Sequence, residues 1–369
     1  RAVVTYFPAP ASYTGEDVVE LSCHGGGLIP RLTLDACLRA GAREAEPGEF
    51  TRRAYLRGKL DLVQAEAVAD LIETRSRALH VAALGQLDQG LSSRISELRE
   101  GVVRLEALLA HHLDFPEEDD APVPVDQIID EAAKVAERIG ALLATAPEGE
   151  LLREGALAVL AGRPNAGKSS LYNSLLGEER AIVTEEPGTT RDALEATVQI
   201  GGFPFRLVDT AGLRETDRKV EQLGIDVAKR YLKDADVVLL CVPADEELSE
   251  SDRSFLGVLE RPVLVLRTKG DLRGGSPGWV LPEGESSGGE SSAHAVEGVD
   301  ASAVIDVSIR SGDGLDELRS ALPALAYSAL LRVGAEVPVI TRRRHALALE
   351  TAESEVRSFC EGLERGLPP

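Results

Sequence analysis

The chain has 369 residues, 43% of them hydrophobic, which is long enough for two or three domains with apolar cores. Its 62 Asp and Glu residues outnumber its 40 Lys and Arg residues, and the resulting charge of −22 argues against a broadly basic surface that coats nucleic acid; contact with RNA would need a local basic patch. No apolar run approaches transmembrane length, no signal peptide is visible and four scattered cysteines lack metal-ligand spacing, so we expect a cytoplasmic protein with reduced thiols and no membrane association.

The first 61 residues have mixed α+β character. Residues 18–21 alternate like a short strand, a glycine turn at 24–27 opens a helix over 29–39, and residues 47–51 predict a second turn. Three polar side chains stand out in this segment: Glu20, His24 and Lys59. Taken alone, each is more typical of a solvated residue than of a ligand.

Residues 62–152 predict helices. Apolar residues recur at helical spacing over 62–72 and again over 84–109, and the second run predicts one long amphipathic helix. Prolines and acidic residues at 114–122 interrupt the pattern. Asp126 is then expected to be the N-cap of a helix that runs through Ala146.

Residues 153–327 alternate strand and helix patterns, which is typical of a parallel α/β sheet. Residues 273–300, rich in Gly, Ser and Glu, predict a flexible surface insertion, and the helical pattern returns from 328. Since two helical blocks flank one α/β block, we expect the α/β domain to be inserted in a helical domain. Buried strands are expected over residues 156–161, 205–208, 237–242 and 263–266.

Residues 162–169 read GRPNAGKS and fit the G-x-x-x-x-G-K-[ST] pattern of a P-loop. A predicted strand precedes them and a predicted helix follows, so free backbone N–H groups and the helix dipole would point at a phosphate. Lys168 would reach the β- and γ-phosphates, and the Ser169 hydroxyl would bind Mg²⁺.

Three further segments follow in the order expected of a GTPase. Residues 209–212 (DTAG) come after a strand, where Asp209 would hold Mg²⁺ through water and the Gly212 N–H would sense the γ-phosphate, while a threonine in 188–192 would close over the metal. Residues 268–271 fit [NT]-K-x-D, whose aspartate accepts from guanine N1–H and N2–H₂; adenine lacks this donor pair, so GTP is selected. Residues 308–310 resemble the last guanine-contacting loop.

Leu213 follows the switch glycine, where Ras-like proteins place a glutamine that orients the attacking water. Leucine cannot orient water, so another residue must. Position alone does not choose among the candidates just downstream: Arg214, Glu215, Asp217 and Glu221.

The chain resembles the MnmE (TrmE) family of bacterial tRNA-modification GTPases over nearly its whole length, apart from residues 273–300. Besides the GTPase motifs, the resemblance is carried by SYTGED at 12–17, HGG at 24–26, PGEFT at 47–51, GKLDL at 58–62 with QAEA at 64–67, DFP at 114–116 and RRRH at 342–345. Thr268 and Ile309 depart from the usual asparagine and small residue of their motifs, and the family's C-terminal Cys-Ile-Gly-Lys tail is absent.

The resemblance implies a multidomain α/β and α protein: a Ras-like P-loop GTPase domain inserted in a helical domain, preceded by part of an α+β folate-binding and dimerisation domain. The implied boundaries are 1–61 for the partial N-terminal domain, 62–152 and 328–369 for the two parts of the helical domain, and 153–327 for the G domain. The chain contains no methionine and ends soon after a helical run, so we expect both termini to be truncated.

The family works with the flavoprotein MnmG, and the resemblance implies the same for this chain. Together they would form 5-aminomethyl- or 5-carboxymethylaminomethyluridine at the tRNA wobble position, U34, with a one-carbon unit from a reduced folate (5,10-methylene- or formyl-tetrahydrofolate). Family folate contacts correspond to Glu20 and Lys59. The family forms homodimers, and its G domains associate when K⁺ binds beside the nucleotide in place of an arginine finger.

By the same resemblance, Glu221 corresponds to the water-orienting glutamate, and Arg214 would stabilise the switch region. The implied Mg²⁺ ligands are Ser169 and Thr190, and the implied K⁺ ligands are Asn165, Thr184, Glu186 and Thr189. The expected GTP-binding residues are Asn165, Ala166, Gly167, Lys168, Ser169, Ser170, Thr184, Glu185, Glu186, Pro187, Gly188, Thr189, Thr190, Asp209, Thr210, Ala211, Gly212, Thr268, Lys269, Asp271, Ser308, Ile309 and Arg310.

Two alternatives remain. A regulatory GTPase of the Era/Der type, acting in ribosome assembly, would be favoured by a KH-type or tandem G domain, and the sequence contains neither. A dimerising helical scaffold with a vestigial G domain is the third hypothesis. Intact residues of the GTPase motifs argue against it: Lys168, Ser169, Thr190, Asp209 and Asp271.

Overall fold

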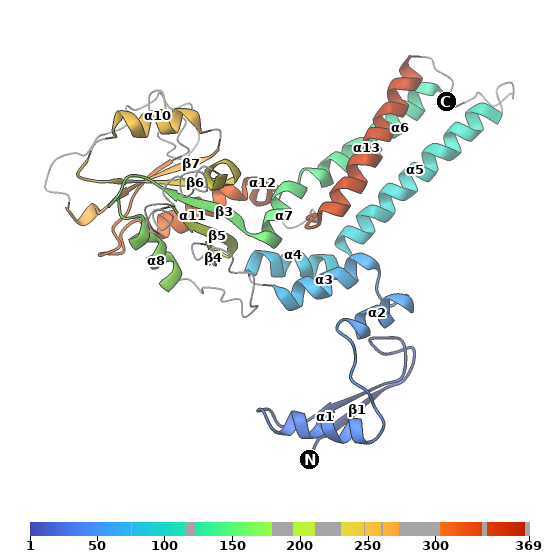
Figure 1. Cartoon of the computed structure of the whole chain (residues 1–369). Helices are drawn as coiled ribbons and strands as arrows, with labels where there is room; N and C mark the ends of the chain where they lie inside the picture. The colour runs from blue at the N-terminus through green and yellow to red at the C-terminus, as the bar shows by residue number, and fades with distance from the viewer. Residues whose placement is uncertain are drawn as a thin grey trace. The chain divides into compact units, whose positions relative to one another are not determined.

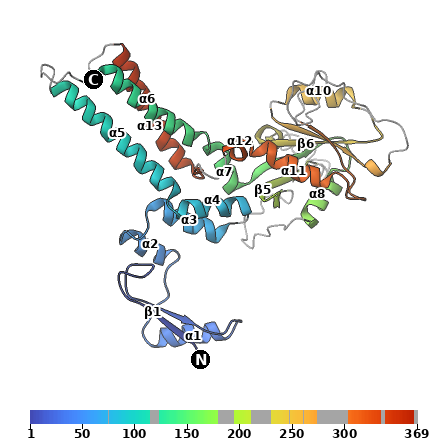
Figure 2. The ribbon, with the colours of Figure 1, turned by 180° about the vertical axis from the view of Figure 1, so that it is seen from behind.

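The computed structural model describes residues 1–74, 76–114, 123–178, 195–210, 230–246, 248–259, 261–272, 303–333 and 338–365. The chain divides into two compact units, which are described separately (Figures 1 and 2). The first unit comprises residues 1–73 and 80–107, and the second comprises residues 74–79 and 108–369. Among the helices in these described ranges, none is both long enough and apolar enough to cross a membrane.

The first unit starts with an antiparallel pair of strands, β1 (Val3–Phe7) and β2 (Val18–Ser22). The predicted strand over 18–21 is confirmed as β2, and the predicted helix over 29–39 is confirmed as α1 (Ile29–Arg39). The predicted turn over 47–51 is wrong in its second half. Gly48, with φ 75°, ends the turn, and α2 (Glu49–Leu56) begins at the next residue.

A break divides the long helix predicted over 84–109. The confirmed helix α3 (Leu62–Glu73) is followed by α4 (Arg77–Leu87) and α5 (Gly90–Asp114). Between α4 and α5, Gln89 has φ 68°, which lies in the left-handed region, and a right-handed helix cannot continue through that conformation. The apolar periodicity therefore continues across a point where the backbone is not helical.

The second unit contains a pair of helices, α6 (Val125–Leu143) and α13 (Arg343–Glu364), that lie side by side in both views (Figures 1 and 2). The prediction that Asp126 is the N-cap of α6 is wrong, because Pro124 occupies that position. Asp126 lies in the first turn, where a carboxylate still complements the helix dipole. Ala146, predicted as the end of the same helix, instead begins α7 (Ala146–Glu154).

A six-stranded sheet, in the order β4-β5-β3-β6-β7-β8, forms the core of this unit. All four predicted strands are confirmed, whereas β4 and β8 were not predicted. Five strands are parallel and β4 runs antiparallel to β5. The strands are β3 (Ala156–Ala161), β4 (Glu195–Ile200), β5 (Phe203–Asp209), β6 (Val237–Pro243), β7 (Val263–Thr268) and β8 (Ala303–Asp306).

Helices cover both faces of the sheet. α10 (Glu250–Val258) lies on one face, where Leu256 belongs to an apolar cluster with side chains of β3, β6 and β7. α8 (Lys168–Glu178) and α11 (Leu315–Ala326) lie on the other face (Figures 1 and 2). β3 and β6 are buried along their whole length, as expected for strands covered on both sides. This confirms the expected fold class, an α/β domain set between helical segments of the chain.

Buried polar contacts fill the junction where the chain passes between the helical segments and the sheet. Tyr327, which is fully buried, accepts a hydrogen bond from Ala156 N–H at 3.2 Å and donates to Pro204 O at 2.6 Å, and Leu151 O lies 3.2 Å away. Its ring packs on Phe203, with centroids 4.7 Å apart. The hydroxyl thus connects α7, β3 and β5.

A second set of contacts lies beside Tyr327. The Glu148 carboxylate accepts from the backbone N–H groups of Ala329 and Leu330, at 2.8 and 2.7 Å, at the start of α12 (Ser328–Val333). Thr145 Oγ1 accepts from Ile340 N–H at 3.1 Å. The entry and exit segments of the α/β domain are therefore hydrogen-bonded to each other.

Candidate functional site

The predicted P-loop joins the end of β3 to the start of α8 through a tight reversal of the chain. Gly162, Asn165 and Gly167 have φ values of 134°, 62° and 87°, which glycine adopts readily and asparagine tolerates. Gly162 has no room for a side chain, because an added Cβ would lie 2.4 Å from Cys241 O on β6. The loop is therefore pressed against the neighbouring strand.

The Lys168 ammonium is held by the loop itself. Lys168 is 5% exposed, and its Nζ donates to Gly162 O at 2.9 Å and to Arg163 O at 2.7 Å. Two backbone carbonyl groups therefore hold the positive charge of Lys168 within the loop. This arrangement suits a phosphate bound over the P-loop, at the N-terminus of α8.

Oxygen-bearing side chains lie at the end of β5 and at the start of α8. The Ser169 hydroxyl donates to Asp209 Oδ2 at 2.6 Å, and Thr210 Oγ1 donates to Leu160 O at 2.7 Å. The parallel register of β3 and β5, which places Leu160 opposite Asp209, brings these groups together. A hydroxyl and a carboxylate are the hard oxygen donors that Mg²⁺ prefers, so Ser169, one of the two predicted ligands, and Asp209, predicted to act through water, fit the metal chemically. The other predicted ligand, Thr190, lies outside the described residues.

The ends of β7 and β8 carry the predicted guanine-binding residues. Thr268 is buried, and its hydroxyl donates to Ala166 O at 2.6 Å, which fastens this loop to the P-loop. Asp271 accepts from the Ser308 hydroxyl at 3.2 Å, and Arg310 Nη1 lies 3.9 Å from the same carboxylate. Threonine at 268 thus supplies a hydroxyl donor at the position that the N-K-x-D pattern gives to an asparagine amide.

The described part of the predicted nucleotide site gathers at the carboxyl edge of the sheet. It comprises Asn165, Ala166, Gly167, Lys168, Ser169, Ser170, Asp209, Thr210, Thr268, Lys269, Asp271, Ser308, Ile309 and Arg310. The remaining predicted residues lie outside the described residues: Thr184, Glu185, Glu186, Pro187, Gly188, Thr189, Thr190, Ala211, Gly212, Arg214 and Glu221. Across the described ranges, no three His, Cys, Asp or Glu side chains are grouped as a metal cluster.

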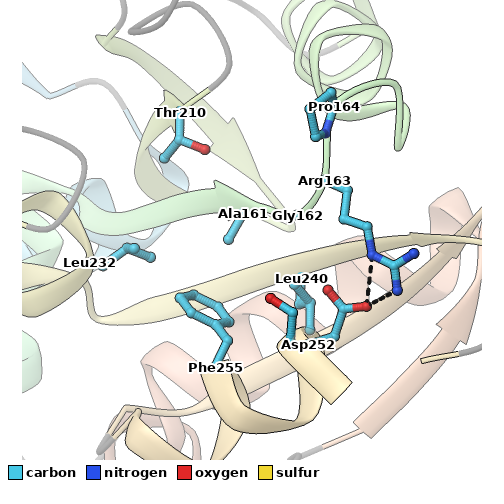
Figure 3. Close-up of a pocket in the computed structure, with 10 residues that line it drawn as sticks. Ala161, Gly162, Arg163, Pro164, Thr210, Leu232, Leu240, Asp252 and Phe255 are labelled. Carbon is cyan, nitrogen blue, oxygen red and sulfur yellow. Dashed lines mark hydrogen bonds and ion pairs between the residues drawn. The ribbon is translucent and has the colours of Figure 1, made fainter. Parts of the chain in front are cut away.

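One polar contact of the P-loop was not predicted from the sequence. Arg163 reaches across to α10, where its guanidinium hydrogen-bonds Asp252 Oδ2 through both Nε, at 3.0 Å, and Nη2 (Figure 3). Its Nη1 also lies 3.0 Å from Glu246 Oε2. The pair borders a pocket of about 300 Å³ with Leu240 and Phe255 among its apolar lining (Figure 3). The only hint in the sequence is the Ser249-x-x-Asp252 capping box, which predicts a helix start and not a partner.

The predicted folate residues lie in the first unit. Glu20 is exposed on β2, opposite Thr5, and Lys59 Nζ donates to Pro10 O at 3.2 Å. Among the described contacts of this unit, none joins Glu20, His24 and Lys59 to one another. The assignment of Glu20 and Lys59 to a folate site therefore stays a prediction from the sequence resemblance.

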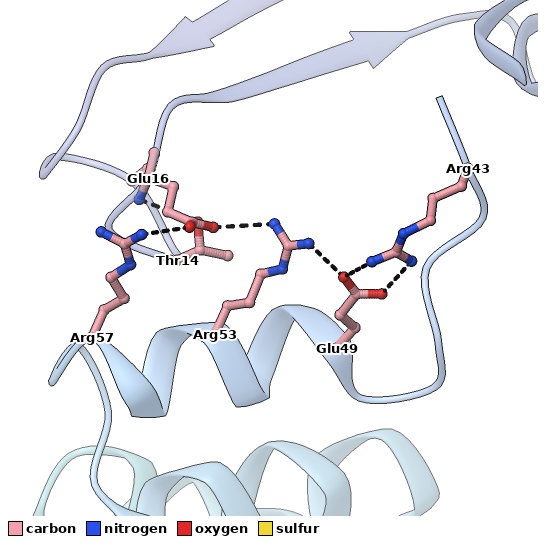
Figure 4. Close-up of polar contacts among 7 residues, drawn as sticks. Thr14, Glu16, Arg43, Glu49, Arg53 and Arg57 are labelled. Carbon is pink, nitrogen blue, oxygen red and sulfur yellow. Dashed lines mark hydrogen bonds and ion pairs between the residues drawn. The ribbon is translucent and has the colours of Figure 1, made fainter. Parts of the chain in front are cut away.

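A ladder of alternating charges lies near Lys59. Arg43 and Arg53 both bind Glu49 at 2.6 Å, and Arg53 and Arg57 bind Glu16 at 3.2 and 2.7 Å (Figure 4). The hydrogen bond from Arg43, followed by those from the Glu46 backbone and Arg53, lowers the pKa of Glu49 to about 2. The ladder fastens the loop that carries Glu16 to α2.

Two family models cover the chain. Residues 62–369 match the model described as the MnmE helical domain, and residues 1–59 match that of the GTP-binding protein TrmE N-terminus. Three curated relatives have the name tRNA modification GTPase MnmE. The relative from Heliobacterium modesticaldum is 40% identical over 383 residues, covering 100% of this chain and 78% of its own length. The one from Moorella thermoacetica is 42% identical over 369 residues, covering 100% and 77%, and the one from Aquifex aeolicus is 42% identical over 366 residues, covering 98% and 76%.

Proposed function

Because the chain belongs to the MnmE family of tRNA modification GTPases, we propose that it hydrolyses GTP to GDP and phosphate and couples this reaction to modification of the tRNA wobble uridine, U34. The observation that carries the proposal is the meeting of Lys168, Ser169 and Asp209 at the end of β3 and β5. Both family models are those of MnmE, so the Era/Der alternative has no support beyond a shared GTPase domain.

In the proposed reaction the chain's own groups position the nucleotide. Lys168, held by two carbonyl groups, places its positive charge at the β- and γ-phosphates, and Asp271 accepts from the donor edge of guanine. Ser169 and Thr190, with Asp209 in support, would hold Mg²⁺, which would supply positive charge to the phosphate oxygens. Glu221 orients the attacking water, and Arg214 stabilises the switch region.

We further propose that K⁺ stimulates hydrolysis. The proposed ligands are Asn165, which is exposed in the P-loop turn, and Thr184, Glu186 and Thr189. A cation held by these residues would offset negative charge that develops in the transition state, the role that an arginine finger fills in other GTPases.

The remaining proposals rest on family membership. The protein acts in the cytoplasm as a homodimer that forms a heterotetramer with MnmG, and a reduced folate bound at Glu20 and Lys59 supplies the one-carbon unit. The domains proposed for these tasks are the partial folate-binding and dimerisation domain at 1–61, the G domain at 153–327 and the helical domain at 62–152 and 328–369.

The experiment that tests the core of the proposal is GTP turnover by this chain in KCl and in NaCl at equal ionic strength. We expect turnover in both salts and a much higher rate in KCl. Equal rates would refute the K⁺ site and leave the GTPase proposal standing, whereas absence of turnover and of GTP binding would refute both. Glu221→Ala is the matched variant: it should bind GTP as the parent chain does and lose most of the turnover.

A further inference from the structure

Thr268 joins the predicted guanine-binding loop at 268–271 to the P-loop. Its side chain lies at the carboxyl end of β7 and is only 2% exposed. The hydroxyl donates to Ala166 O at 2.6 Å, and the Thr268 carbonyl accepts from Ala244 N–H at 2.7 Å. Thr268 is therefore held through its backbone and through its side chain, with its hydroxyl directed at the P-loop.

Chemistry fixes the direction of the hydrogen bond between Thr268 and Ala166. A carbonyl oxygen only accepts, so the Thr268 hydroxyl must be the donor, and a hydroxyl has a single proton to donate. The oxygen that remains has only acceptor capacity, which suits an N–H group of a ligand but not a ring nitrogen that carries a lone pair. While this bond is made, Thr268 cannot donate to a nucleotide base.

Turning the Thr268 hydroxyl toward a base would exchange one hydrogen bond for another without gaining any. Ala166 is fully buried, and depriving a buried carbonyl of its donor is costly. A Cβ added to Gly167 would lie 3.4 Å from Thr268 Cβ and 3.5 Å from its Oγ1, so the side chain already packs against the P-loop backbone. Because a β-branched side chain is also stiff at χ1, we expect the bond to Ala166 to persist when a nucleotide binds.

A guanine base in the proposed site presents donors and acceptors on different atoms. Its N1–H and N2–H₂ donate to the Asp271 carboxylate, whereas N7 and O6 only accept. With Asp271 at one end of the base and the phosphates over the P-loop at the other, the imidazole ring that carries N7 is placed beside residue 268, which bonds the P-loop. The Ser308 hydroxyl offers no alternative donor, because it already donates to Asp271 at 3.2 Å.

We propose that Thr268 sets how the base is recognised: its only proton is committed to the P-loop, so Asp271 selects guanine at N1 and N2 while N7 is not read. An asparagine amide has two N–H donors and can hold Ala166 O and N7 together. The residue at 268 therefore decides whether the chain distinguishes a guanine nucleotide from one that lacks N7. The inference rests on the proposed GTP binding.

The test is calorimetric titration of the full chain with GDP and with 7-deaza-GDP, in which a C–H group replaces N7; diphosphates avoid hydrolysis during the titration. We expect the two dissociation constants to agree within about twofold, because an N7 that receives no hydrogen bond is removed without loss. Thr268→Asn should bind GDP about fivefold more tightly than 7-deaza-GDP, the contribution of one neutral hydrogen bond.

Thr268→Val removes the proton and keeps the shape of the side chain. It should weaken the binding of GDP and of 7-deaza-GDP by the same factor, because the lost hydrogen bond holds the P-loop and not the base. The control is Thr351→Val, which removes a hydroxyl that donates to Leu347 O at 2.9 Å on α13, a helix without predicted nucleotide residues. This control should leave both dissociation constants unchanged.

A parent chain that prefers GDP over 7-deaza-GDP by more than about twofold would overturn the inference. A Thr268→Asn chain without a preference would overturn it too, as would a Thr268→Val chain that loses more affinity for GDP than for 7-deaza-GDP. The comparison in the parent chain needs no substitution, so a variant that does not fold leaves that comparison decisive.

Inosine diphosphate, which keeps N1–H and lacks the N2 amino group, serves as the reference for the Asp271 contact. We expect it to bind at least about tenfold more weakly than GDP, because a hydrogen bond to a charged group is lost. Equal binding of GDP and inosine diphosphate, or no binding of either, would refute the proposed guanine site, and with it the inference. Weaker binding of inosine diphosphate together with a preference for GDP over 7-deaza-GDP would refute the inference alone.

Discussion

Replacing Tyr327 with phenylalanine removes one oxygen atom from the junction between α7, β3 and β5. That oxygen accepts from Ala156 N–H at 3.2 Å and donates to Pro204 O at 2.6 Å. Phenylalanine keeps the ring and its packing on Phe203 and Phe205. The substitution therefore isolates the contribution of a buried hydroxyl that joins two neighbouring strands to the segment leaving the sheet.

The expected loss follows from the two partners. A lost intramolecular hydrogen bond costs about 1 kcal/mol, and a buried backbone group left without a partner costs about 1–3 kcal/mol. Pro204 O loses a short bond and Ala156 N–H loses the acceptor that Tyr327 provides, so we expect the free energy of unfolding to fall by about 2–4 kcal/mol. A typical domain has only about 5–15 kcal/mol in total.

Amide hydrogen exchange, read by mass spectrometry, suits a chain with two compact units, because it reports local opening without assuming one global transition. Peptides that contain Ala156 or Pro204 should exchange faster in Tyr327→Phe, and the unfolding transition of the second unit should move to lower urea concentration. The control is Tyr55→Phe, which removes a hydroxyl from a tyrosine that is 44% exposed on α2 and should change stability by less than about 0.5 kcal/mol. If Tyr327→Phe behaves like this control, the hydroxyl does not hold the junction and the reasoning fails.

Four further predictions follow from single contacts. Lys168→Ala should lower kcat/KM for GTP at least about 100-fold, measured by phosphate release, because it removes the charge facing the phosphates. Asp271→Asn should change the base preference from guanine to xanthine in competition binding. Xanthine has a carbonyl where guanine has its N2 amino group, and the asparagine amide can donate to it. Gly149→Ala should lower the free energy of unfolding by at least about 2 kcal/mol, because the added Cβ would lie 2.1 Å from Ile340 O. Gly362→Ala, whose added Cβ would have nothing within 4 Å, should not lower it, and urea titrations compare the two variants. Burial raises the pKa of Cys241 from 9.0 to about 12. Between these two values only the unfolded thiol ionises, so the stability that is present below pH 9 is lost as the pH rises. The fall in the free energy of unfolding, up to about 1.4 kcal/mol per pH unit, should be smaller in Cys241→Ala.

The sequence predicts those elements whose signal is local. β3 is an uninterrupted apolar run between a glycine and the P-loop, and its bounds are those predicted, as are those of α1. β4 was missed because Glu195–Ile200 mixes polar and apolar residues, although the pair Gly201–Gly202 that follows is a hairpin signal. The break at Gln89 has only a weak local signal, the flanking Asp88 and Gly90, and the apolar periodicity that continues on either side of it outweighs that signal.

The residues of the candidate site also fall into two groups, those with a local sequence signal and those without one. Lys168, Ser169, Asp209 and Asp271 are predicted by motif spacing, because each lies at the carboxyl end of a strand or in the segment that follows it, and these ends meet at one edge of the sheet. The Arg163–Asp252 contact depends on where α10 packs on the sheet, which no short-range pattern encodes. The same holds for Tyr327, whose hydroxyl partners lie 123 and 171 residues away.

The hydrogen bond between Thr145 and Ile340 has a topological consequence. These two residues are 195 positions apart, yet they connect the end of α6 to the approach to α13, so the helices form an antiparallel hairpin in which an entire domain stands in place of the turn. A disordered loop of that length would cost about 3 kcal/mol more to close than a turn of roughly four residues. A folded insert whose two ends already meet removes that entropic penalty. Bringing α6 and α13 together then costs no more entropy than it would if a short turn joined them.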